Sequence, residues 1–281
     1  MMDQSKARRI LRQHVETDRL LGVEVVPLGQ RPPAVAAPLD AAVSATPEVE
    51  ATGPRHVAPE TPGAGGLEPG PAAGAIPRLD RARKLEVLEA MDVQEVRGCT
   101  KCALCHSRTQ TVFGEGDADA RLMFVGEGPG QTEDELGRPF VGRAGELLNK
   151  MIAAMQLRRE QVYIANVVKC RPPENRPPTP AEAAACWGYL RRQIMTIAPT
   201  VIVTLGGPAT KTLLNTQTGI TMLRGTWQEF TGLRPEGPVI PLMPTFHPAF
   251  VLRNYTEDTR KKVWADLKQA MGKLQAADAP V

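Results

Sequence analysis

The sequence has few aromatic residues, and they are unevenly distributed. Only 4% of its 281 residues are aromatic, and all of these lie between Phe113 and Trp264. Aromatic side chains supply much of the apolar surface that a protein core buries. We therefore expect one compact domain at the C-terminal end of the chain, over residues 80–275.

Long apolar runs are also missing from the sequence. No stretch approaches the roughly 20 residues that a membrane span requires, and the segment Met1 to Lys6 lacks the apolar centre of a secretory signal. We therefore expect a cytoplasmic protein with no membrane partner. The formal net charge is only +3, so charge alone neither requires nor excludes a polyanionic partner.

The first 79 residues divide into two segments. Within residues 1–25, apolar positions among many charges after Ser5 predict a short amphipathic helix. This helix is either a marginal one without a core of its own or a docking element for a protein partner. Residues 26–79 are rich in Pro, Ala and Gly, a composition that cannot bury enough apolar surface to offset the entropy of ordering. We expect them to form a disordered, extended linker.

From residue 80 onward, short apolar runs alternate with amphipathic segments. Strands are expected at residues 122–127, 162–168, 200–205 and 239–243, and helices at 80–96, 144–155, 180–197, 208–214 and 258–274. Strands that alternate with helices predict a parallel sheet with helices on both faces. The expected fold is therefore α/β, a three-layer α/β/α sandwich with a central four-stranded parallel sheet, preceded by a disordered N-terminal extension.

Polar residues stand at the ends of three expected strands. Glu127 follows the first strand inside the turn Gly126 to Gly130, Asn166 lies in the second strand, and His247 follows the fourth. The carboxyl ends of parallel strands are where open α/β sheets place their ligands, so we expect these groups to converge. For the glycine-rich turn taken alone, an ordinary strand-to-loop connection with a solvated Glu is the alternative.

Five cysteines need an explanation in a cytoplasmic protein, where disulfides are disfavoured. Cys99 and Cys102 form a C-x2-C pair, and after 67 residues Cys170 and Cys186 form a C-x15-C pair. Four thiolates suit either zinc or an iron–sulfur cluster, and spacing does not choose between them. A second ligand set would be Cys99, Cys102 and Cys105, and unligated thiols are the remaining alternative.

Longer motifs accompany the cysteine spacing. They are Gly126-Glu127-Gly128-Pro129-Gly130, Gly137-Arg138-Pro139-Phe140-Val141-Gly142, Asn166-Val167-Val168-Lys169-Cys170-Arg171-Pro172-Pro173 and His247-Pro248-Ala249-Phe250-Val251-Leu252-Arg253-Asn254. Together they resemble the family 4 uracil-DNA glycosylases, the iron–sulfur members of the uracil-DNA glycosylase superfamily. The resemblance covers roughly residues 97–270, in order and with matching gaps.

This resemblance implies an α/β/α sandwich, in agreement with the pattern of strands and helices. It implies a [4Fe-4S] cluster of structural function, bound by Cys99, Cys102, Cys170 and Cys186, with Cys105 as a spectator. It also implies a DNA-repair enzyme that flips uracil out of DNA and hydrolyses its N-glycosidic bond, leaving an abasic site. We expect a monomer whose partner is uracil-containing DNA, single- or double-stranded.

The resemblance also assigns roles to the pocket residues. Phe140 would stack on the flipped ring, and Asn166 would donate to uracil O4 and accept from N3–H, a pattern that cytosine does not match. His247 would donate to uracil O2 and stabilise the leaving anion. Backbone contacts to uracil are expected at Gly128. Two acids remain: Glu127 as the candidate general base, and Glu133 either near the pocket or in a solvated loop.

Contacts to DNA are expected after His247. Val251 and Leu252 would wedge into the gap left by the flipped base, and Arg253 would bind a phosphate. Two other functions compete with a glycosylase. One is a catalytically weak module that binds damaged DNA or tethers a partner, and the other is a nucleotide-binding redox protein. The complete set of Glu127, Phe140, Asn166 and His247 favours the enzyme.

Overall fold

The computed structural model of the chain describes residues 79–232 and 239–277. The helix and linker expected before residue 79 lie outside this part, so both stay predictions. The described helices are α2 (Arg81–Met91), α3 (Gln131–Leu136), α4 (Arg143–Ala154), α5 (Pro180–Ile197), α6 (Gly207–Leu214), α7 (Ile220–Leu223), α8 (Pro248–Arg253) and α9 (Glu257–Ala276). None of the helices described here is long and apolar enough to cross a membrane.

A six-stranded sheet forms the centre of this domain, in the order β1-β3-β2-β4-β6-β5. Its strands are β1 (Glu115–Gly116), β2 (Leu122–Gly126), β3 (Tyr163–Asn166), β4 (Val201–Leu205), β5 (Gln228–Phe230) and β6 (Ile240–Thr245). The four central strands are parallel, as expected. Two short antiparallel strands, β1 and β5, extend the sheet at its edges and were not predicted.

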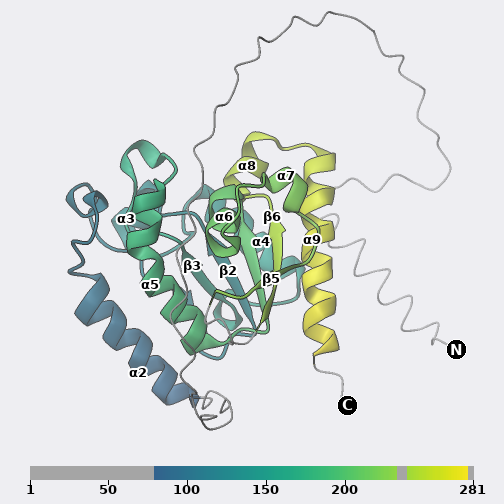
Figure 1. The fold of residues 1–281 in the computed structure, drawn as a ribbon. Helices are drawn as coiled ribbons and strands as arrows, with labels where there is room; N and C mark the ends of the chain where they lie inside the picture. The colour runs from purple at the N-terminus through teal and green to yellow at the C-terminus, as the bar shows by residue number, and fades with distance from the viewer. Residues whose placement is uncertain (1–78, 233–238, 278–281) are drawn as a thin grey trace, which may run out of the picture. The chain divides into compact units, whose positions relative to one another are not determined.

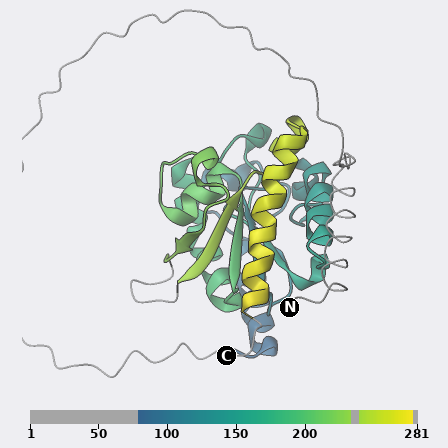
Figure 2. The ribbon, with the colours of Figure 1, turned by 90° about the vertical axis from the view of Figure 1, so that its right-hand side faces the viewer.

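Helices cover both faces of the sheet, which confirms the three-layer sandwich. Helices α2 and α5 lie on one side and α9 on the other (Figure 1), and α9 runs across the sheet in the view turned by 90° (Figure 2). The side chains of each strand point alternately to the two faces of the sheet, so each strand contributes to the hydrophobic core on both faces. In β2, Met123 and Val125 pack with α2, α5 and α6, whereas Leu122 and Phe124 pack with α4 and α9.

Local sequence signals set several helix boundaries. The hydroxyl of Thr179 accepts from the Glu182 N–H, and the Glu182 carboxylate accepts from the Thr179 N–H, so the expected capping box begins α5. The helix expected over residues 80–96 is shorter, because α2 gives way to a π-helical turn at Asp92–Val96. This turn leads directly to the loop that carries the first cysteines.

Candidate active site

The turn after β2 and the end of β3 meet in register. Gly126 pairs with Asn166 across the parallel ladder. A Cβ atom added at Gly126 would lie 2.4 Å from Asn166 Oδ1 and 2.5 Å from Phe140 Cζ. Since real Cβ atoms do not approach other atoms so closely, only glycine allows the amide and the aromatic ring to converge here. The structure therefore brings the turn after β2 and the end of β3, both expected at one edge of the sheet, together with the ring of Phe140.

Asn166 is the reading group expected in this pocket. Its side chain is buried, with only 1% of the residue exposed. Among the described residues, no hydrogen-bond donor reaches its Oδ1 atom. A buried amide oxygen without a partner costs about 1–3 kcal/mol. Such an orphaned acceptor, next to an aromatic ring, is what a binding site for a flat N–H donor requires.

Phe140 forms the wall of the pocket and is held in an unusual backbone conformation. Its φ angle is 50°, in the left-handed region. Glu133 Oε1 accepts hydrogen bonds from the backbone N–H groups of Val141, at 2.9 Å, and Gly142, at 2.8 Å. These two bonds fix the loop directly after Phe140. The conformation that aims this ring into the pocket is therefore supported by a carboxylate from α3.

The ring of His247 lies beside that of Phe140, with ring centroids 5.6 Å apart and an angle of 33° between the ring planes. Its Nδ1 atom accepts a hydrogen bond of 3.1 Å from the Ala249 N–H at the start of α8. Burial, and to a smaller degree the charge of Arg253, lowers the pKa of His247 to about 4. The ring is therefore neutral at pH 7, and because Nδ1 is the acceptor, the proton resides on Nε2. The free side of the ring is a hydrogen-bond donor.

Glu127 is partly buried beside this pair. Burial raises the pKa of its carboxyl group, and the positive charge of Arg253 opposes that shift. The charge of Arg253 acts on both Glu127 and His247. Next to Glu127, a Cβ atom added at Gly128 would meet Val168 Cγ2 at 2.8 Å, so this turn needs its second glycine as well. Of the expected site residues, Phe140 and Asn166 meet at Gly126, His247 lies beside Phe140, and Glu127 and Gly128 directly follow Gly126.

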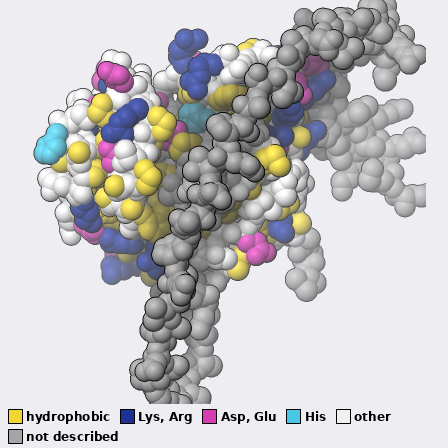
Figure 3. Space-filling view, turned by 45° about the horizontal axis from the view of Figure 1, so that its top comes forward, with side chains coloured by type: hydrophobic (Ala, Val, Ile, Leu, Met, Phe, Trp, Pro, Cys, Tyr) yellow, Lys and Arg dark blue, Asp and Glu magenta, His cyan; other side chains and the backbone are white. Residues whose placement is uncertain are grey.

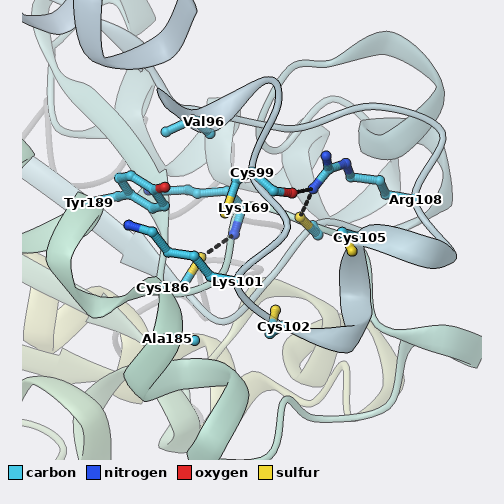
Figure 4. Close-up of a pocket in the computed structure, with 11 residues that line it drawn as sticks. Val96, Cys99, Lys101, Cys102, Cys105, Arg108, Lys169, Ala185, Cys186 and Tyr189 are labelled. Carbon is cyan, nitrogen blue, oxygen red and sulfur yellow. Dashed lines mark hydrogen bonds between the residues drawn. The ribbon is translucent and has the colours of Figure 1, made fainter. Parts of the chain in front are cut away.

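A second cavity lies away from the pocket, and all five cysteines line it. Its volume is about 280 Å³, including space open to solvent, and Figure 4 shows the thiol groups around it. No disulfide joins these five thiols. Arg108 Nη1 donates to Cys170 Sγ at 3.1 Å, and the Lys169 N–H donates to Cys186 Sγ at 3.4 Å. Donors directed at sulfur are typical of the surroundings of metal-bound thiolates.

Comparison with known proteins agrees with this geometry. A sequence model of the uracil DNA glycosylase superfamily matches residues 113–268. A type-4 uracil-DNA glycosylase of Thermotoga maritima is 46% identical over 186 residues, which are 66% of this chain and 93% of that protein. The type-4 enzyme of Sulfurisphaera tokodaii is 46% identical over 63% of this chain and 80% of its own length. The type-4 enzyme of Archaeoglobus fulgidus is 42% identical over 69% of this chain and 97% of its own length.

The chain belongs to the uracil-DNA glycosylase superfamily, in its type-4 branch. The match to the superfamily model begins at residue 113 and therefore leaves out the first three cysteines of this chain. The similarity to the type-4 relatives extends over longer segments. The residues expected to form the pocket, Glu127, Phe140, Asn166 and His247, all lie within the matched segment. The strand ends predicted that Glu127, Asn166 and His247 lie at one edge of the sheet, whereas the role of Phe140 was predicted from the resemblance alone.

The arrangement of the cysteines in this type-4 glycosylase bears on the metal group that they would hold. Among the described residues, no three His, Cys, Asp or Glu side chains lie where they could hold a single metal ion. The thiols that line this one cavity match the donor set of an iron–sulfur cluster and also that of zinc. Burial raises the pKa of Cys170 to about 11 and also raises that of Cys186, so binding of the metal group would release protons.

The prediction for one DNA-binding residue of this glycosylase is wrong. Val251 is 1% exposed and packs in the core with α4 and α9, so it cannot wedge into DNA. Its neighbour Leu252 is only partly buried and stays a candidate wedge. Sequence reasoning missed Phe250, which is 36% exposed on the same helix. The space-filling view shows basic and apolar side chains interspersed on the visible part of this face (Figure 3).

Glu133 also has a more specific position than the sequence indicated. It was expected either near the pocket or in a solvated loop, and its Oε1 atom accepts hydrogen bonds from the loop that carries Phe140. A Cβ atom added at Gly130 would lie 2.7 Å from Glu133 Oε2, so the glycine makes room for this carboxylate. The signal in the sequence is the glycine before α3. The bond itself could not be predicted, because its partners are backbone atoms eight and nine residues away.

Proposed function

We propose that this protein removes uracil from DNA by hydrolysing its N-glycosidic bond, which leaves an abasic site. The observation that carries the proposal is the orphaned Oδ1 atom of Asn166, buried beside Phe140. Uracil N3–H is a donor that fits this acceptor, and the uracil ring is flat. Because the pocket is buried, the base must leave the DNA stack to reach it.

Selection of uracil follows from the hydrogen-bonding pattern of one amide. Asn166 presents an acceptor for N3–H, and its NH2 group is a donor for O4. Cytosine has an unprotonated N3 and an amino group at C4, which reverses both requirements. Placing cytosine here would leave two buried pairs unmade, at about 1–3 kcal/mol for each group. Stacking on Phe140 would bind either ring and would contribute affinity without discrimination.

Bond cleavage would be assisted by His247. As the glycosidic bond breaks, negative charge develops on uracil and positive character on the sugar. The neutral ring of His247 presents Nε2–H, and a fixed donor directed at developing charge stabilises the transition state. Because the ring is neutral, it offers this bond without repelling the cationic sugar.

Glu127 is the remaining group for activating water. Its carboxyl pKa is raised by burial, which makes the carboxylate a stronger base at a given pH. Its negative charge also favours the cationic sugar. Arg253, whose charge acts on both Glu127 and His247, would bind a phosphate of the DNA.

The cofactor proposed for this site is a [4Fe-4S] cluster held by Cys99, Cys102, Cys170 and Cys186, with Cys105 as a spectator. When bound, the cluster would supply a covalent tie between the loop before β1, the end of β3 and α5. We predict a brown protein that contains iron and sulfide in equal amounts. Zinc in stoichiometric amount and no iron, in protein prepared without oxygen, would contradict this assignment.

The test of the function is incubation with DNA that contains a single uracil, either single- or double-stranded, followed by alkali. We expect strand cleavage at the uracil position and none in matched DNA that contains cytosine. The variant His247→Ala serves as the control for a contaminating glycosylase. Absence of cleavage at every enzyme concentration would reject the enzyme and leave a DNA-binding module. Action as a monomer, location in the cytoplasm and a protein partner for the N-terminal segment stay predictions.

A further inference from the structure

Lys169 is completely buried, and the proposed chemistry does not use it. The residue has 0% exposure and lies three positions after Asn166 and one before Cys170. Lysine is almost never buried completely unless its amino group has partners, because taking it out of water is costly. A lysine in this position, between the residue that reads the base and a cysteine of the second cavity, calls for a reason.

The contacts of Lys169 connect Asn166 with helix α5. Its Nζ atom donates to the backbone carbonyl oxygen of Asn166 at 2.9 Å and to Gln193 Oε1 at 2.6 Å. Its backbone N–H donates to Cys186 Sγ at 3.4 Å. Gln193 and Cys186 both belong to α5. One residue therefore holds the main chain of Asn166 with its side chain and contacts a cluster cysteine with its backbone.

Gln193 fixes the position of the Lys169 side chain. It is also 0% exposed, and its Nε2 atom donates to the Phe113 carbonyl oxygen at 2.9 Å and to the Tyr163 hydroxyl at 3.3 Å. With Nε2 occupied in this way, Oε1 must face Lys169. A buried network in which each member has a partner is rigid, and removal of one member leaves the others unpaired. The amino group of Lys169 thus has little freedom to move.

The carbonyl group that Lys169 holds is the last one of β3. Its direction sets the path of the backbone at Asn166, and so the direction in which the Asn166 side chain points. That side chain must face Gly126 and Phe140 with an error well below 1 Å to accept a hydrogen bond from uracil. The contacts of Lys169 are therefore placed where a small displacement would impair recognition of the base.

We propose that Lys169 is a positioning residue for uracil recognition, which holds the backbone of Asn166 and links it to the cysteine-bearing helix α5. The proposal rests on the proposed function. It gives the cysteine-lined cavity a role in recognition, because the same helix that would bind the cluster supports the base-reading amide. It also explains why a lysine, and not an apolar residue, fills this buried position.

The test uses Lys169→Met, which keeps the length of the side chain and removes the donor. Affinity for free uracil is measured by calorimetry and by product inhibition, affinity for abasic-site DNA by titration, and cluster content by iron analysis. We expect uracil to bind about tenfold more weakly, which corresponds to about 1.4 kcal/mol. Binding of abasic-site DNA and the iron content stay at the wild-type level, since neither depends on the Asn166 side chain.

Two further variants keep the test decisive if Lys169→Met folds poorly. Gln193→Met removes the acceptor from a position outside the cysteine motifs and is expected to weaken uracil binding in the same way. Tyr163→Phe removes only the most distant bond of the network and is the matched control, expected to bind uracil like the wild type. In the background of Asn166→Ala, Lys169→Met should cause no further loss, because residues that act as one unit are not additive.

The proposal is overturned if Lys169→Met and Gln193→Met bind uracil normally. It is also overturned if the loss is shared by Tyr163→Phe, persists fully in the Asn166→Ala background, or extends equally to abasic-site DNA. Failure of the proposed function is a different result, because it would appear in the wild-type protein, which would then neither excise nor bind uracil.

Discussion

The two polar groups of the pocket are held in opposite ways. Asn166 is almost completely buried at the end of a central strand, and its backbone is bonded to a buried lysine. His247 follows the last parallel strand, is partly exposed, and is oriented by the Ala249 N–H two residues further on. Pairing with Gly126 and the bond from Lys169, which Gln193 of α5 holds, position the first, whereas a local turn positions the second. The group proposed to read the base is thus built into the core, and the group proposed to stabilise charge lies at the N-cap of the short helix α8.

Replacement of His247 by Ala tests the group that a local turn positions, and this change should have the largest effect. Loss of one donor to developing charge lowers kcat by about 100- to 1000-fold. KM should change little, because the bond strengthens mainly in the transition state. Single-turnover rates on uracil-containing DNA measure this. A large rise in KM with unchanged kcat would show that His247 only binds the ground state.

Glu127→Gln should have the next largest effect, a fall in kcat of about 100-fold, if its carboxylate activates water. Burial raises the pKa of Glu127 and lowers that of His247 to about 4. In the wild type, the rate should therefore fall on acidification as Glu127 takes up a proton, before His247 does. In Glu127→Gln this acidic limb should be absent from the pH profile of kcat. An acidic limb that persists in the variant would assign it to another group.

Asn166→Asp tests the buried member. A carboxylate cannot donate to uracil O4, so discrimination between uracil and cytosine should fall by about tenfold or more, as expected for one lost buried pair. The ratio of kcat/KM for the two bases, in otherwise identical DNA, measures the discrimination. Unchanged discrimination would show that another residue reads the edge of the ring.

The dependence of stability on pH should show the smallest effect. His247 has a folded-state pKa of about 4, below the value of about 6.5 in an unfolded chain. The unfolded state then binds the extra proton first, so this residue lowers the free energy of unfolding as the pH falls from about 7 toward 4. Between pH 7 and 5 we expect a contribution of about 1–2 kcal/mol, absent from His247→Gln. Urea denaturation of both proteins at the two pH values would detect it, and equal losses in both would contradict it.

Much of the site could be predicted because it depends on strand ends. Four apolar runs predicted the four parallel strands, and in a parallel sheet the carboxyl ends lie along one edge, where Asn166 and His247 are found. The edge strands β1 and β5 were not predicted, because strands of two or three residues are too short to show an alternation of polar and apolar residues. The expected helix after residue 80 was too long, because helical spacing alone does not show where a π-helical turn begins.

Other features depend on contacts that spacing cannot show. Val251 and Leu252 are adjacent apolar residues, and only the packing of α8 against α4 reveals that the first is buried. Lys169 follows two valines in the sequence, which was a signal of burial, but a lysine is normally exposed. Its acceptor Gln193 is 24 residues away on another element. Such pairs are fixed by the fold as a whole.

A crystal structure with free uracil tests the central claim most directly. The account predicts that the ring stacks on Phe140, that N3 lies within hydrogen-bond distance of Asn166 Oδ1, and that O2 lies within the same distance of His247 Nε2. Uracil bound elsewhere, or bound here with Asn166 Oδ1 turned toward a protein donor, would contradict it.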